Sequence, residues 1–174
     1  QSDADDLARR LGIRCPRIAI EPMHRAFEAA LGQALAEGNR EIADENIQAR
    51  IRGAVVMAFS NAFAHMPLAT GNKSELSTGY CTLYGDMVGG LAPIGDVYKT
   101  QVFRLAQHLN VEAGHERINR SIITKPPSAE LKPNQVDQDK LPPYDLLDAI
   151  LERYIEGDQT GEQIASAGFD GEAG

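Results

Sequence analysis

The sequence contains little cysteine and no long apolar run. Cys15 and Cys81 are its two cysteines, too few and too far apart for a disulfide framework or a metal cluster, so we expect a reducing compartment and, by default, the cytoplasm. No apolar run approaches the roughly 20 residues that cross a membrane. The first ten residues, QSDADDLARR, are acidic and lack the apolar core of a signal peptide. These absences predict a soluble protein with no membrane partner.

Positive charge is also scarce. The 174 residues include 25 acidic and 17 basic side chains, which gives a net charge of -8 at pH 7, and no basic patch interrupts this balance. Because such a field repels a phosphate backbone, we expect no nucleic-acid partner. The spacing of a P-loop and the Gly-x-Gly-x-x-Gly fingerprint are both absent. The four histidines have no metal-ligand spacing, so we assign them no chemistry.

The length suits one domain, in which helical and strand-like patterns alternate. Apolar residues at helical spacing predict helices at residues 3–11, 22–35, 42–63, 144–156 and 160–168. A further helix is predicted to begin at Asp96 or Lys99 and to run to Leu109. Short apolar runs predict strands at residues 17–20 and 65–70. The alternation favours an α/β fold with a mainly parallel sheet. Residues 121–143 hold five of the nine prolines, which predicts an extended surface connection.

The stretch LATGNKSE, at residues 68–75, is a candidate ligand site. A buried strand that turns into a short helix is a usual place for a ligand in an open α/β sheet. Thr70 offers a hydroxyl at the strand end, and the carboxylate of Glu75 in the first helical turn is a suitable ligand for Mg²⁺. The same residues also fit a structural role, in which Asn72 or Ser74 caps the helix and Glu75 favours its positive end.

Asn46 and Arg50 form a second candidate group. They are four residues apart and share a helix face, where an Arg fork and an amide could together hold a carboxylate or a phosphate. The alternative is a solvated helix face that pairs with Asp44 or Glu45.

A glycine-rich loop carries the third group. Asp86 lies in this loop and Lys99 stands at the start of the following helix, where it suits either a phosphate contact or an ordinary surface position. Cys81 has no neighbouring His or Lys to lower its pKa, so we expect a plain buried thiol.

Four stretches in order carry a family resemblance. The stretches ENIQARIRG, ATGNKSE, STGYCTLYGDMVGGLAPIGDVYKT and KPPSAELKPNQVDQDKLPPYDLLDAILERYIE closely resemble the synthetase domain of glutamine-dependent NAD synthetases, from about Leu7 to Phe169. The resemblance implies a Rossmann-like adenine nucleotide alpha hydrolase (ATP-pyrophosphatase) fold, a parallel sheet with flanking helices, N-terminally incomplete. Residues 1–174 would be part of one NAD synthetase domain, with no amidase domain present.

The resemblance also implies a reaction. Family members use ATP and Mg²⁺ to adenylate the carboxylate of deamido-NAD, and ammonia then displaces AMP to give NAD. In glutamine-dependent members the ammonia comes from an amidase domain. No protein nucleophile is required, because adenylation already makes the carboxylate oxygen a good leaving group and metal and cationic side chains offset the phosphate charge.

Each family role falls on a matching position of this sequence. Glu75 would be a magnesium ligand. The residues expected to contact ATP are Thr70, Lys99 and Ser128. The residues expected to contact deamido-NAD are Asn46, Arg50 and Asp86. A homodimer is also implied, and the helix at residues 42–63 is our candidate for its interface.

Two departures qualify the resemblance. Leu83 stands where ammonia-dependent relatives tend to have Lys, which fits the glutamine-dependent branch. The 174 residues also contain neither the family's Ser-Gly-Gly-x-Asp-Ser loop nor its basic C-terminal tail, so we expect a fragment that cannot complete adenylation alone. Two alternatives stay open: a catalytically silent interaction module, and another amidating or thiolating enzyme of the ATP-pyrophosphatase superfamily.

Overall fold

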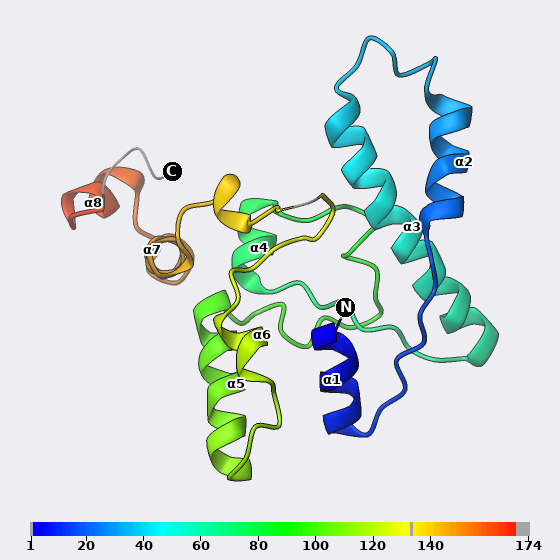
Figure 1. The fold of residues 1–174 in the computed structure, drawn as a ribbon. Coiled ribbons are helices and arrows are strands. Elements are labelled where there is room, and N and C mark those ends of the chain that lie inside the picture. Colours follow the sequence, from blue (N-terminus) through cyan, green and yellow to red (C-terminus); the bar gives the residue numbers. More distant parts are fainter. Residues whose placement is uncertain (1, 133, 170–174) are drawn as a thin grey trace.

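Helices account for most of the regular backbone in the computed structural model, which describes residues 2–132 and 134–169 (Figure 1). The α-helices are α1 Ser2–Leu11, α2 Glu21–Leu31, α3 Arg40–Phe63, α4 Lys73–Thr78, α5 Lys99–Ala113, α6 Arg120–Thr124, α7 Tyr144–Leu151 and α8 Gly161–Ser166. A 3₁₀ turn, η1, spans Asp137–Asp139, and a π-helical turn, η2 at Glu152–Glu156, directly extends α7.

Local capping residues explain where several helices begin. The side chain of Asn39 accepts a hydrogen bond from the backbone N–H of Ile42 at 3.2 Å and so opens α3. Thr160 and Gln163 form a capping box at the start of α8. These signals are local in sequence, and the helices predicted at residues 3–11, 42–63 and 160–168 are confirmed. By contrast, α2 ends at Leu31, before the predicted residue 35, and α5 continues beyond residue 109 to Ala113.

The predicted parallel sheet is not found in the described residues. Residues 17–20 have no regular structure, and the run at 65–70 pairs only through one isolated parallel bridge between Leu68 and Leu91. Two hydrogen bonds accompany this bridge, from Ala69 N to Leu91 O at 2.9 Å and from Gly90 N to Pro67 O at 2.8 Å. A strand requires a partner along several residues, and neither run has one here. The strand predictions were therefore wrong for residues 17–20 and largely so for residues 65–70.

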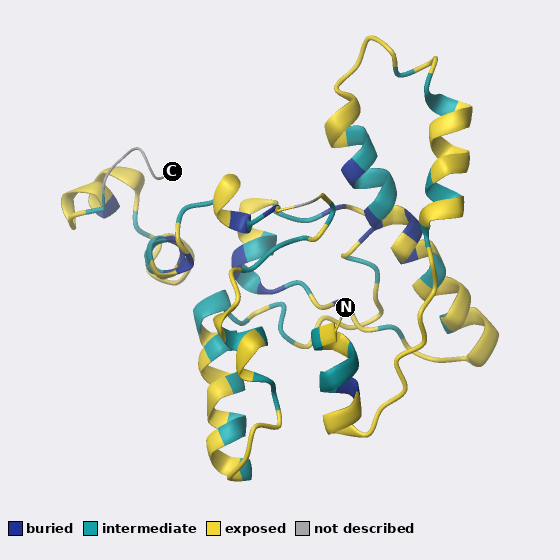
Figure 2. Cartoon of the chain, viewed as in Figure 1, coloured by how far each residue is buried: buried dark blue, intermediate teal, exposed yellow. Residues whose placement is uncertain are grey.

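The buried core lies where α4, α5 and α7 pack together. Tyr98, Tyr144, Leu147 and Leu151 form its buried apolar cluster, with Leu141 packed against it. Leu147 and Leu151 of α7 are buried in this core, whereas Tyr154 on η2 is 60% exposed. Figure 2 shows α2 mostly exposed, and none of its residues is buried.

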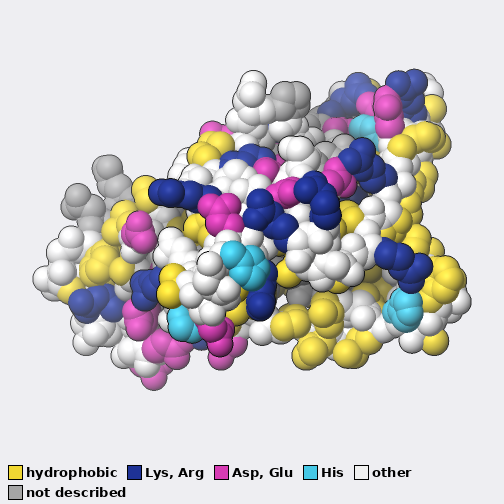
Figure 3. Space-filling view, turned by 60° about the horizontal axis from the view of Figure 1, so that its bottom comes forward, with side chains coloured by type: hydrophobic (Ala, Val, Ile, Leu, Met, Phe, Trp, Pro, Cys, Tyr) yellow, Lys and Arg dark blue, Asp and Glu magenta, His cyan; other side chains and the backbone are white. Residues whose placement is uncertain are grey.

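The apolar stripe of α3 is covered only along its first half. Ile51 is buried and Ile47 and Val55 are half-buried, but Phe59 and Phe63 further along are 39% and 59% exposed. In the view of Figure 3, hydrophobic side chains gather along the lower edge of the molecule. Within the described residues, no helix combines the length and the apolar character needed to cross a membrane.

Candidate functional site

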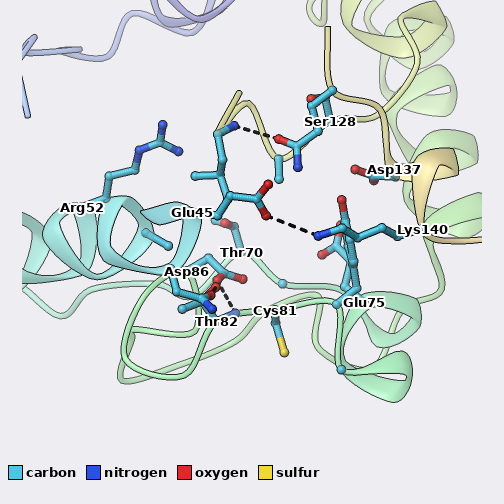
Figure 4. Close-up of a pocket in the computed structure, with 18 of the residues that line it drawn as sticks. Glu45, Arg52, Thr70, Glu75, Cys81, Thr82, Asp86, Ser128, Asp137 and Lys140 are labelled. Atoms are coloured by element: carbon cyan, nitrogen blue, oxygen red, sulfur yellow. Dashed lines mark hydrogen bonds and ion pairs between the residues drawn. The ribbon is translucent and has the colours of Figure 1, made fainter. Parts of the chain in front are cut away.

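A cavity of about 560 Å³ lies between α3, the segment around α4, and the connection that leads to α7 (Figure 4). Its wall includes six of the seven residues that the sequence indicates as a site, namely Asn46, Thr70, Glu75, Asp86, Lys99 and Ser128. These residues lie up to 82 positions apart in the sequence, since Asn46 and Ser128 are its first and last members. The fold thus brings together motifs that are distant in the chain.

Glu75 and Lys99 form an ion pair inside this cavity. The Lys99 ammonium donates to Oε1 of Glu75 at 2.8 Å, and both side chains are less than one-fifth exposed. The other oxygen, Oε2, accepts from the backbone N–H of Asn72 at 3.0 Å, while Oδ1 of Asn72 accepts from Glu75 N at 3.1 Å. This capping box confirms the structural role considered for Asn72 and Glu75. It also leaves Oε1 of Glu75 facing the Lys99 ammonium.

A buried polar relay fixes the position of both members of this pair. Asp148 on α7 is 5% exposed and accepts from the Ser74 hydroxyl at 2.5 Å and from Thr100 N at 2.8 Å. The Ser74 oxygen in turn accepts from Lys99 N at 2.9 Å. Since Ser74 precedes Glu75 and Lys99 begins α5, the relay holds both backbones in one place. It also puts negative charge at the positive end of α5.

A second hydrogen-bonded group lies on the α3 side of the cavity. Thr82 donates its hydroxyl proton to Oδ1 of Asn46 at 2.8 Å, and its backbone N–H donates to Oδ1 of Asp86 at 2.7 Å. Thr82 is buried and so orients both predicted residues. Because the oxygen of Asn46 is engaged by Thr82, its amide N–H₂ is the group suited to a ligand.

Arg50 is the predicted residue that the structure leaves outside the cavity wall. Its side chain is exposed and donates to the carbonyl of Leu83 at 3.2 Å. Arg52 lines the cavity instead and donates to the carbonyl of Glu130 at 3.3 Å. The reason is the helix period: Glu45 and Arg52 are seven residues apart and share a face, whereas Arg50 is turned away from it.

Ser128 and Thr70 lie at two edges of the cavity. The hydroxyl oxygen of Ser128 accepts from Glu130 N at 3.1 Å, which orders the turn after the Pro-Pro pair. Thr70 is exposed and immediately precedes the loop into α4. Both residues line the cavity.

The sequence patterns did not identify several charged residues that line the cavity. Glu45 is buried and its carboxylate lies between Lys132 and Lys140, each 3.3 Å away. Asp137 is also buried and accepts from the Tyr144 hydroxyl at 2.8 Å. Glu45 could have been found from its helical spacing with Ala49 and Arg52, but no local signal marked Asp137.

Cys81 and Tyr80 also line the cavity, and both side chains have a raised pKa that keeps them protonated at neutral pH. Burial, followed by the charges of Asp86 and Glu75, raises the pKa of the Cys81 thiol above its ordinary value. Burial and then the charge of Asp137 raise the pKa of Tyr80 to about 12. A thiol that stays protonated is a poor nucleophile, which supports the expectation of a plain thiol at Cys81.

Known proteins are similar to this chain in sequence and in fold. The sequence model of the NAD synthase family matches residues 1–173. The chain belongs to the NAD synthase family. This NAD synthase chain is 55% identical, over 176 aligned residues, to the glutamine-dependent NAD(+) synthetase of Rhodobacter capsulatus; the match covers 97% of this chain and 32% of that protein.

Solved structures of the NAD synthase family share its fold. The glutamine-dependent NAD+ synthetase from Acinetobacter baumannii, in complex with ADP, matches with a TM-score of 0.69 and 42% identity over 99% of this chain and 30% of that one. NMN synthetase from Francisella tularensis matches with a TM-score of 0.77 and 27% identity over 95% of this chain and 63% of that one. These neighbours imply the adenine nucleotide alpha hydrolase-like fold. The chain spans about a third of the length of the curated relatives it matches.

Proposed function

We propose that this chain is the nucleotide-binding part of an enzyme that amidates deamido-NAD to NAD with ATP, through an adenylated intermediate, releasing AMP and pyrophosphate. One observation carries the proposal: a single cavity gathers six side chains from the stretches that resemble NAD synthetases, in a chain that belongs to the NAD synthase family. The cavity offers cationic, carboxylate and hydroxyl groups and a thiol that stays protonated, a set suited to holding phosphates and activating a carboxylate without a protein nucleophile.

We assign the ATP side of the cavity to Thr70, Lys99 and Ser128. The ammonium of Lys99 is a point charge inside the cavity and attracts the phosphate groups of ATP. The two hydroxyl groups can donate to phosphate oxygens. The buried relay from Asp148 keeps the Lys99 backbone fixed while its side chain exchanges partners.

Glu75 suits a magnesium ion on the same side. Its Oε1 reaches into the cavity and is neutralised only by the Lys99 ammonium at 2.8 Å among the described residues. A hard cation prefers such carboxylate oxygens. Bound Mg²⁺ would supply the positive charge that offsets the phosphates during adenylation. Lys99, released from Glu75, would then turn to the phosphates.

We assign the deamido-NAD side to Asn46 and Asp86, which Thr82 orients from behind. The amide N–H₂ of Asn46 can donate to a ligand oxygen, and Asp86 can accept from a ligand donor. Arg52 supplies the cationic group on this wall, where the sequence pattern had indicated Arg50. Because Arg52 belongs to the helix face that lines the cavity, it is the better candidate for an anionic group of the dinucleotide.

We further propose that residues 1–174 belong to one synthetase domain, which receives ammonia released from glutamine by an amidase domain. The relatives named as glutamine-dependent support this source of ammonia. The parallel bridge between Leu68 and Leu91 supports a place for these residues in the parallel sheet of a Rossmann-like fold.

We also propose that two copies of the chain pair through the second half of α3. Val56, Met57, Phe59 and Phe63 are each more than one-third exposed on this helix. Beside them lies an apolar groove of about 300 Å³ whose wall includes Ile18. An apolar face of this extent is typical of an interface between subunits.

The substitution Glu75→Gln in the full-length protein tests the assigned activity. Gln keeps the capping box but removes the charge, so α4 should persist while the metal ligand is lost. We expect NAD formation from deamido-NAD, ATP and ammonium to fall by at least about tenfold, with deamido-NAD affinity changed by less than about threefold.

Glu112→Gln on the exposed side of α5 is the matched control and should leave both quantities unchanged. Equal activity of Glu75→Gln and the wild-type protein would remove Glu75 from the metal role. A wild-type protein that forms no NAD from these three substrates would overturn the proposed function itself.

A further inference from the structure

A group of metal-ligating side chains lies between α2 and α3, and none of its three members lines the cavity described above. Nε2 of His24 lies 2.6 Å from Oδ1 of Asp44, and Nδ1 of the same ring lies 3.8 Å from Oε2 of Glu28. One ligand atom from each of these side chains lies within 4.8 Å of the other two. His24 and Glu28 share a face of α2 because they are four residues apart, whereas Asp44 belongs to α3. Local spacing in the sequence therefore does not reveal the group.

The surroundings of the group orient its ligand atoms. The amide of Gln48 donates to Oδ2 of Asp44 at 3.0 Å, while Oδ1 of the same carboxylate faces His24. An outer hydrogen bond of this kind fixes the orientation of a metal-binding carboxylate. The side chain of His24 is 17% exposed, so its ring is largely shielded from solvent. Glu28 and Asp44 also line a separate cavity of about 280 Å³, which has room for water molecules that complete a coordination shell.

The donor set favours a transition-metal ion over magnesium. Two carboxylates and a neutral imidazole carry two negative charges, which one divalent ion balances. Imidazole nitrogen is a good ligand for zinc and its first-row neighbours, whereas Mg²⁺ prefers oxygen ligands. Zinc binds nitrogen and oxygen ligands at about 2.0–2.2 Å, so His24 and Asp44 need to separate by less than about 1 Å to admit the ion. Glu28 is half-exposed and its long side chain can close the remaining distance.

We propose that His24, Glu28 and Asp44 bind a divalent transition-metal ion of the Zn²⁺ type, which links α2 to α3. This site is separate from the proposed synthesis of NAD and does not depend on it. Figure 1 shows α2 beside the first half of α3. None of the residues of α2 is buried, so little apolar packing holds this helix in place. An ion shared between the two helices adds a direct link and stabilises α2 in particular.

The test measures the binding of zinc chloride to the full-length protein by titration calorimetry. Excess Mg²⁺ is present, so that the metal position proposed at Glu75 is already occupied. We expect one zinc ion per chain, with a Kd that rises at least tenfold in His24→Ala and in Asp44→Asn. Asn keeps the shape of Asp but removes its charge. His108→Ala, which removes an exposed histidine from α5, is the control and should leave the Kd unchanged.

A wild-type protein that binds no zinc under these conditions overturns the proposal. Equal zinc affinity of the wild type and Asp44→Asn also overturns it, because the ion would then lie elsewhere on the protein.

Hydrogen exchange locates the ion without any measurement of activity. The amides of α2 are followed in the wild type with zinc chloride and with magnesium chloride at equal ionic strength, since a ligand that bridges two helices suppresses local opening. We expect exchange in α2 to slow at least fivefold with zinc, and Asp44→Asn to lack this effect. The amides of α5 are the internal control and should exchange at the same rate in both salts. Unchanged exchange in α2 of the wild type overturns the site, whether or not the variants fold.

Discussion

Asp148 is the residue on which the geometry of the ATP side depends most directly. Its two oxygens accept from the Ser74 hydroxyl and from Thr100 N, and both Asp148 and Ser74 are buried. Asp148→Ala leaves these buried donors unpaired, so we expect the free energy of unfolding to fall by about 2–4 kcal/mol. Urea denaturation measures this difference. Asp145→Ala on the exposed face of α7 should change it by less than about 0.5 kcal/mol, and an equal loss for both variants would contradict the prediction.

The side chains that line the cavity could be predicted where a short sequence motif or the helical period indicated them. Asn46, Thr70 and Lys99 follow from short motifs and line the cavity. Arg50 was placed by its spacing to Asn46 and by the family resemblance, whereas the face that lines the cavity is set by Glu45 and positions four and seven residues later. The functional roles of these residues remain predictions until the substitutions are measured.

Two loop segments pack tightly where the backbone around Gly89 crosses the backbone around Ala69. A Cβ atom on Gly89 would lie 2.3 Å from Ala69 N and 2.9 Å from its Cβ, so only glycine fits without a shift of the backbone. We expect Gly89→Ala to lower the free energy of unfolding by about 1–3 kcal/mol, measured by urea denaturation. Gly161→Ala, where a Cβ meets nothing within 4 Å, is the control and should be nearly neutral. An equally neutral Gly89→Ala would show that the crossing is not tight.

Helices and strands differed in how far they could be predicted. The start of α3 at Asn39 and of α8 at Thr160 depends on residues within one turn, and such signals are visible in the sequence. A strand depends on a partner elsewhere in the chain. The runs at 17–20 and 65–70 have strand-like composition, but the described residues give them one bridge, at Leu68.

The whole molecule exposes an apolar face along the second half of α3, and pairing of two copies would cover it. We expect light scattering coupled to gel filtration to give twice the monomer mass at high micromolar concentration. Phe59→Asp should give the monomer, because it puts a charge on the exposed face. Tyr154→Asp, an exposed aromatic on η2, is the control and should leave the mass unchanged. A wild-type monomer at that concentration would refute the pairing.

Local sequence patterns could not predict the buried hydrogen bonds that join Ser74, Lys99 and Asp148. Ser74 and Asp148 look like ordinary polar helix residues, and only the packing of α4, α5 and α7 brings them together. Family resemblance supplied six residues that line the cavity, but not those that hold them in place from behind.

The hydrogen bond between Ser74 and Asp148 joins residues 74 positions apart, and this separation bears on protein synthesis. A nascent chain that ends before α7 contains Glu75 and Lys99 but lacks the carboxylate that anchors their backbones. Contacts between distant residues form late because a long loop must close first. The cavity around Glu75 and Lys99 therefore reaches its final geometry only after α7 has left the ribosome. We expect nucleotide binding at the proposed ATP side to wait until residue 148 has emerged.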